Sequence, residues 1–459
     1  MVHGDDGNRM RQFEKMDNYR KLLLLIIVVA TAMIFDITML NLFAVINKLF
    51  VTIMAKKILF VIITSTILTT AYFILSRTAV EGASAMGMRL PLMKIQKPAQ
   101  LIHFVLAALM ITMIFQISLY SYYNALILIL VILCSYGISL AILCIFVLQM
   151  LRALAIRRNS IVITVFITAL ATVMVNASIA MVDISLRISD WPTELRFAAG
   201  TGDVSKGRYD VLDQLYFASY IISFVCAWVA GVTMLSYYVG KLGKLKFSLV
   251  TIAPLIFFLG QFAPQLTTIF SSLVHSDVFS LAFLTTTIVI LSKPIGGLML
   301  ASVFWAMGRA TERNATIRYH LIIAGFGFLL LFTANQAISL SIISFPPFGL
   351  PTLMVMVSSA YLLVISLYRS AVSISTNAEL HSSIKRIAKS HISLLDSMVI
   401  SDARKAIEAK AVEAIRKESA SITSKTGIDA NLDEGEIKTY LDMVLQELQA
   451  TRRGGKNIQ

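Results

Sequence analysis

Two ionisable residues lie inside long apolar runs and are the first candidates for chemistry in this sequence. Asp36 lies in the run that starts at Leu22, and Lys293 precedes Pro294 in a later run. Each is about fourteen residues, roughly 21 Å along a helix, from one end of its run. A charge at the centre of a bilayer costs about 3 kcal/mol unless it is paired or wetted. One hypothesis is a buried Asp36–Lys293 pair that lines a substrate or proton path. The alternatives are a structural ion pair, or an Asp36 that marks the outer end of a shorter helix.

Four side-chain amides in the same apolar runs extend this candidate intramembrane polar site. Gln261 and Gln265 are four residues apart and share a helical face, and Pro264 between them frees a backbone carbonyl one turn earlier. Asn335 and Gln336 lie in a later run. Broken helices of this kind line transporter sites. Amides more commonly hold helices together with no ligand present, so both interpretations stay open.

Ten apolar stretches must position these side chains, and each is long enough to cross a bilayer core of about 30 Å as a helix. Apolar residues make up 57% of the chain and charged residues 14%, against about a quarter charged in soluble domains. In lipid, a helix satisfies its own backbone hydrogen bonds. The sequence therefore predicts an all-α fold, a polytopic transmembrane helical bundle with about ten spans. The expected spans are 22–46, 58–75, 101–120, 125–151, 161–182, 214–239, 248–273, 279–307, 320–343 and 351–368.

Two of these spans leave details open. The run from Leu22 to Val29 precedes an A-x-A pattern typical of signal-peptide cleavage, but it continues apolar to about Ile46, which favours an uncleaved first helix. The span 279–307 contains Pro294, which predicts a kinked single crossing, with a re-entrant pair of half-helices as the alternative.

The basic residues indicate how the bundle is oriented. Loops on one side of the predicted spans, together with the N-terminus, hold 18 Lys and Arg before the tail, and those on the other side hold 7. The side rich in short basic loops stays cytoplasmic. We expect a cytoplasmic N-terminus at 1–21, a transmembrane bundle at 22–368 and a cytoplasmic helical tail at 369–459. The external segment 183–213 carries six acids without calcium-loop spacing, which predicts a solvated cap and no metal site.

The tail is predicted to form two helices, at 376–418 and 433–449. Packable residues recur from Leu380 to Met398 with a period of 3.5, the seam of a short coiled coil. The apolar face of the second helix needs a partner. That partner is the first tail helix, a second copy of the chain or another protein.

The sequence contains no motif typical of catalysis. His381 and His391 invite comparison with a phospho-accepting helix, yet no nucleotide-binding segment follows them. We find no metal, cofactor or nucleophile motif. The net charge of +14 comes from basic residues interleaved with acids and gathered at helix ends, which argues against nucleic-acid binding. We therefore predict neither an enzyme nor a cofactor, and the lipid bilayer as the main partner.

Five segments of the last third carry a resemblance: SKPIGG (292–297), VFWAMGR (303–309), FLLLFTANQA (328–337), PPFGLP (346–351) and the tail from SAVSIS to AELHSSIKR (370–386). They resemble a group of multi-pass membrane proteins of ammonia-oxidising archaea that has no assigned activity. The resemblance implies the cytoplasmic membrane of an archaeon and transfers no site residue.

Two functions fit these features best, and a structural subunit of a larger membrane complex is a third interpretation. The first is a membrane sensor or scaffold that signals through its cytoplasmic helical tail, favoured by the apolar faces of that tail. The alternative is a secondary transporter with a midplane polar site near Asp36, Gln261, Gln265 and Lys293.

Overall fold

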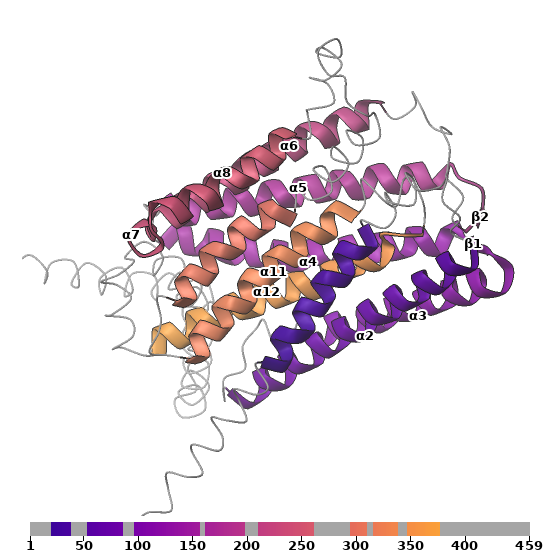
Figure 1. Cartoon of the computed structure of the whole chain (residues 1–459), viewed down its shortest axis with the longest axis horizontal. Helices are drawn as coiled ribbons and strands as arrows, with labels where there is room; N and C mark the ends of the chain where they lie inside the picture. The colour runs from indigo at the N-terminus through magenta and orange to yellow at the C-terminus, as the bar shows by residue number, and fades with distance from the viewer. Residues whose placement is uncertain are drawn as a thin grey trace, which may run out of the picture.

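The computed structural model describes residues 20–37, 53–85, 96–156, 161–197, 210–260, 294–309, 315–337 and 347–376. These residues form a bundle of long helices with one short pair of strands (Figure 1). The labelled elements are α2 (Ile53–Ala85), α3 (Gln96–Tyr120), β1 (Tyr122–Asn124), α4 (Ala125–Ile156), α5 (Ile161–Ser189), β2 (Glu194–Arg196), α6 (Asp210–Ser236), α7 (Val239–Leu242), α8 (Lys244–Gly260), α11 (Ala315–Ala337) and α12 (Leu350–Thr376). Two further helices cover 20–37 and 294–309.

The helical bundle expected from the sequence is confirmed. Within the described ranges, seven helices are long and apolar enough to cross a membrane: α2, α3, α4, α5, α6, α11 and α12. The other three predicted spans overlap the helix 20–37, α8 and the helix 294–309, which are shorter as described. The expected count of about ten spans therefore stays a prediction, and both tail helices fall outside the described residues.

The outer surface of the bundle presents large apolar side chains. Leu101, Phe104 and Phe115 project from α3, with Phe115 63% exposed, and similar residues project from α2, α4 and α6. Soluble monomers rarely expose apolar patches beyond a few hundred Å². This surface is suited to contact with lipid chains.

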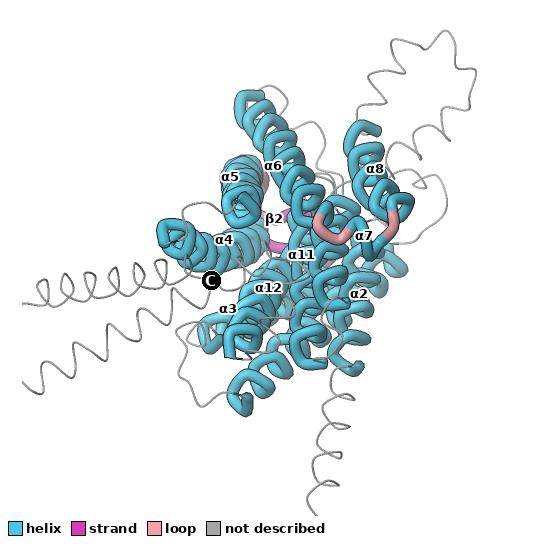
Figure 2. The backbone as a smooth tube through the Cα atoms, turned by 90° about the vertical axis from the view of Figure 1, so that its left-hand side faces the viewer, coloured by secondary structure: helices cyan, strands magenta, loops and turns pink. Residues whose placement is uncertain are grey.

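Helix α12 occupies the centre of the bundle. Every residue from Leu350 to Tyr368 is buried, and the helix contacts α2, α3, α4 and α11. The end-on view shows it enclosed by these neighbours (Figure 2). A helix that is apolar on all faces is stable when protein or lipid surrounds it, and here protein surrounds it.

Close approach of α11 and α12 depends on a glycine. A Cβ added at Gly327 would lie 3.0 Å from the backbone N and Cα of Leu363. Small residues let helix backbones approach in this way in membranes.

We expect Gly327→Ala to destabilise the bundle by about 1–3 kcal/mol, because the added methyl meets backbone atoms that cannot rotate away. The matched control is Gly137→Ala in α4, where an added Cβ meets nothing within 4 Å. Alanine loses less conformational entropy than glycine when a helix forms, so this variant should be as stable as the parent or slightly more stable. Thermal unfolding in detergent, followed by far-UV circular dichroism, compares the two variants. Equal melting temperatures would contradict the assigned packing.

A small antiparallel sheet closes one end of the bundle. β1 in the α3–α4 turn pairs with β2 after α5, with Tyr123 opposite Leu195. The Asn124 side-chain carbonyl accepts from the N–H of Leu126 at 2.8 Å, so it caps α4. The sequence did not predict these strands, since both lie in segments expected to be loops.

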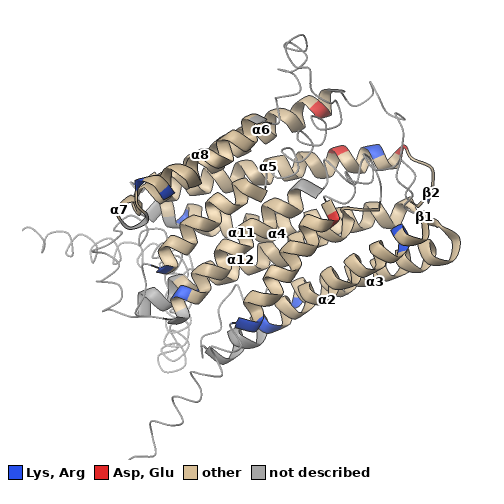
Figure 3. Cartoon of the chain, in the orientation of Figure 1, with Lys and Arg blue, Asp and Glu red and all other residues tan. Residues whose placement is uncertain are grey.

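Charge is distributed unevenly along the bundle axis. Acidic residues lie toward the end that carries β1 and β2, and most basic residues lie at the opposite end with α7 (Figure 3). This is the asymmetry that the positive-inside pattern describes. The side of the membrane on which each end lies stays a prediction.

Candidate functional site

Asn335 of α11 is the centre of a hydrogen-bonded chain that joins four helices. The Tyr136 hydroxyl of α4 donates to Asn335 Oδ1 at 3.2 Å, and Asn335 Nδ2 donates to Asn176 Oδ1 of α5 at 3.3 Å. Asn176 Nδ2 in turn donates to Ser219 Oγ of α6 at 3.0 Å. Tyr136, Asn176 and Asn335 are all buried. The polar groups therefore satisfy one another across the core.

This chain of bonds favours the role of Asn335 in holding helices together. Both polar atoms of its amide already have protein partners, and Ser219 Oγ also donates to the backbone carbonyl of Tyr216. A site for a polar substrate needs hydrogen-bond donors or acceptors that are free to bond to the substrate. Tyr136 and Asn176 were not among the sequence candidates. Asn176 carries the same signal as Asn335, an amide inside an apolar run, whereas the partner of Tyr136 lies 199 residues away in the chain.

A double-mutant cycle of Tyr136→Phe and Asn335→Leu should return a coupling free energy of about 0.6 kcal/mol and no more than roughly 1.7 kcal/mol, the range of interhelical hydrogen bonds in membranes. Unfolding of the two single variants and the double variant in detergent gives this value. Strictly additive effects would show that the Tyr136–Asn335 bond contributes nothing.

The side chain of Asp36, in the helix 20–37, contacts the amino-terminal end of α12. Its Oδ2 accepts from the Thr352 hydroxyl at 2.6 Å and from the Thr352 N–H at 3.3 Å, and its Oδ1 accepts from the Gly349 N–H at 3.5 Å. Gly349 has a φ of 74°, a conformation that favours glycine. A carboxylate at a helix N-terminus satisfies unpaired N–H groups and interacts favourably with the helix dipole.

These contacts give Asp36 a structural role at the start of α12, which the sequence analysis did not predict. Lys293, its proposed partner, lies outside the described residues, so the pair itself stays a hypothesis. Asn335 belongs to a separate set of bonds. The structure therefore does not join Asp36 and Asn335 in one polar site.

The remaining sequence candidates are outside the part that the structure describes. Gln261 and Gln265 fall in the range 261–293, as does the first half of the predicted span 279–307, so the question of a kink there stays open. From Pro294 onward that span is one helix, 294–309. Gln336 lies in α11, and its side chain is outside the description.

An ion-pair cluster at the carboxyl-terminal end of α5 corrects one expectation. Arg187 Nε lies 3.0 Å from Asp183 Oδ1, and Arg187 Nη2 also pairs with Asp213 of α6. The segment from 183 was expected to be a solvated cap, but α5 continues to Ser189, and the side chains of Asp183 and Arg187 are only 5% and 11% exposed. The i,i+4 pair neutralises both charges on one helical face, so the helix can extend past the apolar span.

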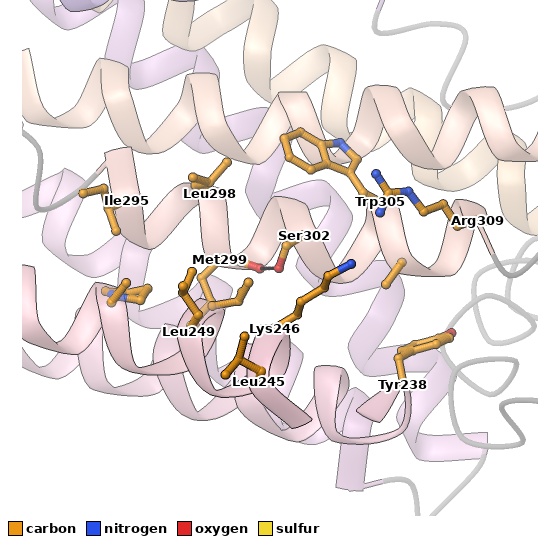
Figure 4. Close-up of a pocket in the computed structure, with 14 residues that line it drawn as sticks. Tyr238, Leu245, Lys246, Leu249, Ile295, Leu298, Met299, Ser302, Trp305 and Arg309 are labelled. Atoms are coloured by element: carbon orange, nitrogen blue, oxygen red, sulfur yellow. Dashed lines mark hydrogen bonds between the residues drawn. The ribbon is translucent and has the colours of Figure 1, made fainter. Parts of the chain in front are cut away.

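A lateral groove lies between α8 and the helix 294–309. Its cavity volume is about 630 Å³, within the range of about 300–1,000 Å³ usual for small-molecule sites. Leu249, Leu298 and Met299 form apolar walls, while Lys246 and Arg309 lie at one end (Figure 4). The sequence analysis did not predict this site, because its lining residues lie on two helices that are distant in the chain and neither segment carries a binding motif.

Two aromatic residues border the groove, Trp305 and Tyr238. The Trp305 indole N–H donates to the Ile322 carbonyl of α11 at 3.1 Å, and a Cβ at Gly325 would come within 2.6 Å of that nitrogen. Burial raises the pKa of the Tyr238 phenol above its usual value, so this residue after α6 stays uncharged. The two cations are therefore the charged groups that line the groove among the described residues.

The apolar helices, their lipid-facing surface and the enclosed polar contacts define an integral membrane protein with a helical bundle. Within the described residues, no group of three His, Cys, Asp or Glu side chains is placed to hold a metal ion. No protein-family model, no curated protein and no solved structure matches this chain.

Proposed function

We propose that this integral membrane protein is a sensor or scaffold that signals through its cytoplasmic helical tail. The observation that carries the proposal is the position of α12, which is enclosed by the bundle and extends to Thr376, into the segment predicted to be the tail. The tail's unpartnered apolar faces, expected from the sequence, supply the surface for a protein partner or for self-association.

The packing around α12 supports a mechanical connection to the tail. Leu363 lies against Gly327 of α11 without space for a methyl group, and the Arg369 guanidinium donates to the Thr78 carbonyl of α2 at 2.7 Å. Close-packed interiors transmit displacements because they have little free volume. A change in the surrounding helices therefore moves α12, and α12 moves the tail.

The proposal includes the location of the protein. Basic residues at one end of the bundle favour a cell membrane location with both termini cytoplasmic. The resemblance noted above suggests the cytoplasmic membrane of an archaeon. A secondary transporter is the alternative; its candidate residues Gln261, Gln265 and Lys293 lie outside the described residues, and uptake assays in reconstituted vesicles test it.

The coupling between the bundle and the tail is tested with a spin label at Ser390→Cys in a chain whose three native cysteines are replaced by alanine. In nanodiscs, Gly327→Ala should change the mobility of this tail label, because it displaces α12. Gly137→Ala, which meets open space, should leave the spectrum unchanged. Identical spectra for both variants and the parent would contradict the proposal.

The role of the tail in binding is tested by ending the chain after Thr376. The sensor or scaffold proposal predicts that the shortened chain loses the soluble proteins, or the second copy, that co-purify with the full chain. Retention of the same partners would place the binding surface in the bundle instead.

A further inference from the structure

The groove between α8 and the helix 294–309 combines a long apolar wall with two positively charged side chains, Lys246 and Arg309. Leu249 and Leu298 face it and are 65% and 42% exposed. In Figure 4 the side chains of Lys246 and Arg309 reach toward the shared space from the two opposite helices. A ligand that matches both features has an apolar chain and an anionic head.

The two cations are available to such a ligand. Neither Lys246 nor Arg309 forms an ion pair with an acid of the described ranges, and both side chains are exposed. Arginine and lysine recognise phosphate through charge-assisted hydrogen bonds. Ser302, which also lines the groove, already donates its hydroxyl hydrogen to the Met299 carbonyl at 2.6 Å, so the phosphate ligands are the two basic side chains.

The depth of the cations fits a lipid rather than a water-soluble ligand. Lys246 lies in the first turn of α8, and Arg309 follows directly after the predicted apolar span 279–307. Both therefore lie at the ends of apolar segments, where phospholipid headgroups are found. The basic end of the bundle is the end predicted to be cytoplasmic, and the cytoplasmic leaflet carries anionic lipid.

We propose that this groove is a binding site for an anionic phospholipid, with the headgroup phosphate between Lys246 and Arg309 and one lipid chain along Leu249 and Leu298. Trp305, held by its bond to Ile322, forms the rigid aromatic side of the headgroup region. This site is independent of the proposed signalling role of α12.

The experiment measures lipid binding to the full chain in detergent by native mass spectrometry, with phosphatidylglycerol and phosphatidylcholine as probes. The wild-type chain should bind phosphatidylglycerol more tightly. The double variant Lys246→Gln and Arg309→Gln should lose about tenfold or more of that affinity, the effect of removing charge-assisted contacts. The control, Lys244→Gln with Arg318→Gln, removes the same charge from exposed residues that do not line the groove, and should change affinity less than twofold.

A second variant tests the apolar wall without altering charge. Leu298→Trp fills the groove from an exposed position and should also weaken phosphatidylglycerol binding about tenfold. The proposal is overturned by equal losses in the two charge variants, by equal affinity for the two lipids, or by unchanged binding in Leu298→Trp. Competition by millimolar inorganic phosphate would assign the cations to a free anion, and failure to bind either lipid would also overturn the lipid site.

Discussion

Replacing Arg187 with alanine should destabilise the bundle by about 3–5 kcal/mol, because it leaves the buried Asp183 carboxylate without its counter-charge. Arg187 Nε lies 3.0 Å from Asp183, and the same guanidinium joins α5 to α6 through Asp213. Unfolding in detergent, monitored by circular dichroism, measures the loss. Asp213→Asn should cost much less, since the Asp213 side chain is 56% exposed and water can replace its partner.

The control for charge removal at this end of the bundle is Arg196→Ala. Arg196 lies in β2 and is exposed, so its removal should change stability by no more than about 0.5 kcal/mol. Adding Asp183→Asn to Arg187→Ala should recover part of the loss, because the uncompensated charge is then absent. An Arg187→Ala variant as stable as Arg196→Ala would contradict the buried ion-pair cluster.

Replacing Asp36 with alanine is expected to cost about 2–4 kcal/mol, because two N–H groups and one hydroxyl at the start of α12 lose their acceptor in a buried position. Asp36→Asn keeps one acceptor oxygen and should lose about half as much. Thr352→Val, which removes only the hydroxyl, should lose less than Asp36→Ala. Melting temperatures of the three variants in detergent give this order.

The same variants separate the helix-capping role of Asp36 from a pair with Lys293. If Lys293 were the main partner, Asp36→Ala would strand a buried cation, and adding Lys293→Met would restore stability. The capping role predicts no rescue by Lys293→Met, since the unsatisfied groups belong to Gly349 and Thr352. Full rescue would show that the ion pair dominates.

The helical membrane fold could be predicted from the sequence because it follows from local composition. Apolar runs that are long enough to cross a bilayer form helices whatever their tertiary neighbours are. The ends of the helices were predicted less accurately than their existence, since α2 extends to Ala85 and α12 to Thr376, well past the predicted spans 58–75 and 351–368. Hydropathy marks where lipid begins, and helical hydrogen bonding continues beyond that boundary.

The polar contacts were predictable only in part, because they depend on which helices become neighbours. Asn335 was selected as an amide in an apolar run, and it does lie buried in a polar cluster. Its partners Tyr136 and Asn176 are the single tyrosine of α4 and the single side-chain amide of α5, but the sequence does not show that these helices lie beside α11. The depth of Asp36 was estimated from an apolar run that continues to about Ile46, whereas its contacts place it at the start of α12.

The central claim is that α12 is enclosed by protein within a bundle whose outer surface faces lipid. Single tryptophans test it in a chain whose three native tryptophans are replaced by phenylalanine, reconstituted with phospholipids brominated on their acyl chains. Phe115→Trp, at a position 63% exposed on α3, should be strongly quenched, and Tyr361→Trp, at a position 3% exposed in α12, should keep most of its fluorescence. Equal quenching at the two positions would contradict the central placement of α12, and quenching at neither would contradict insertion in the bilayer.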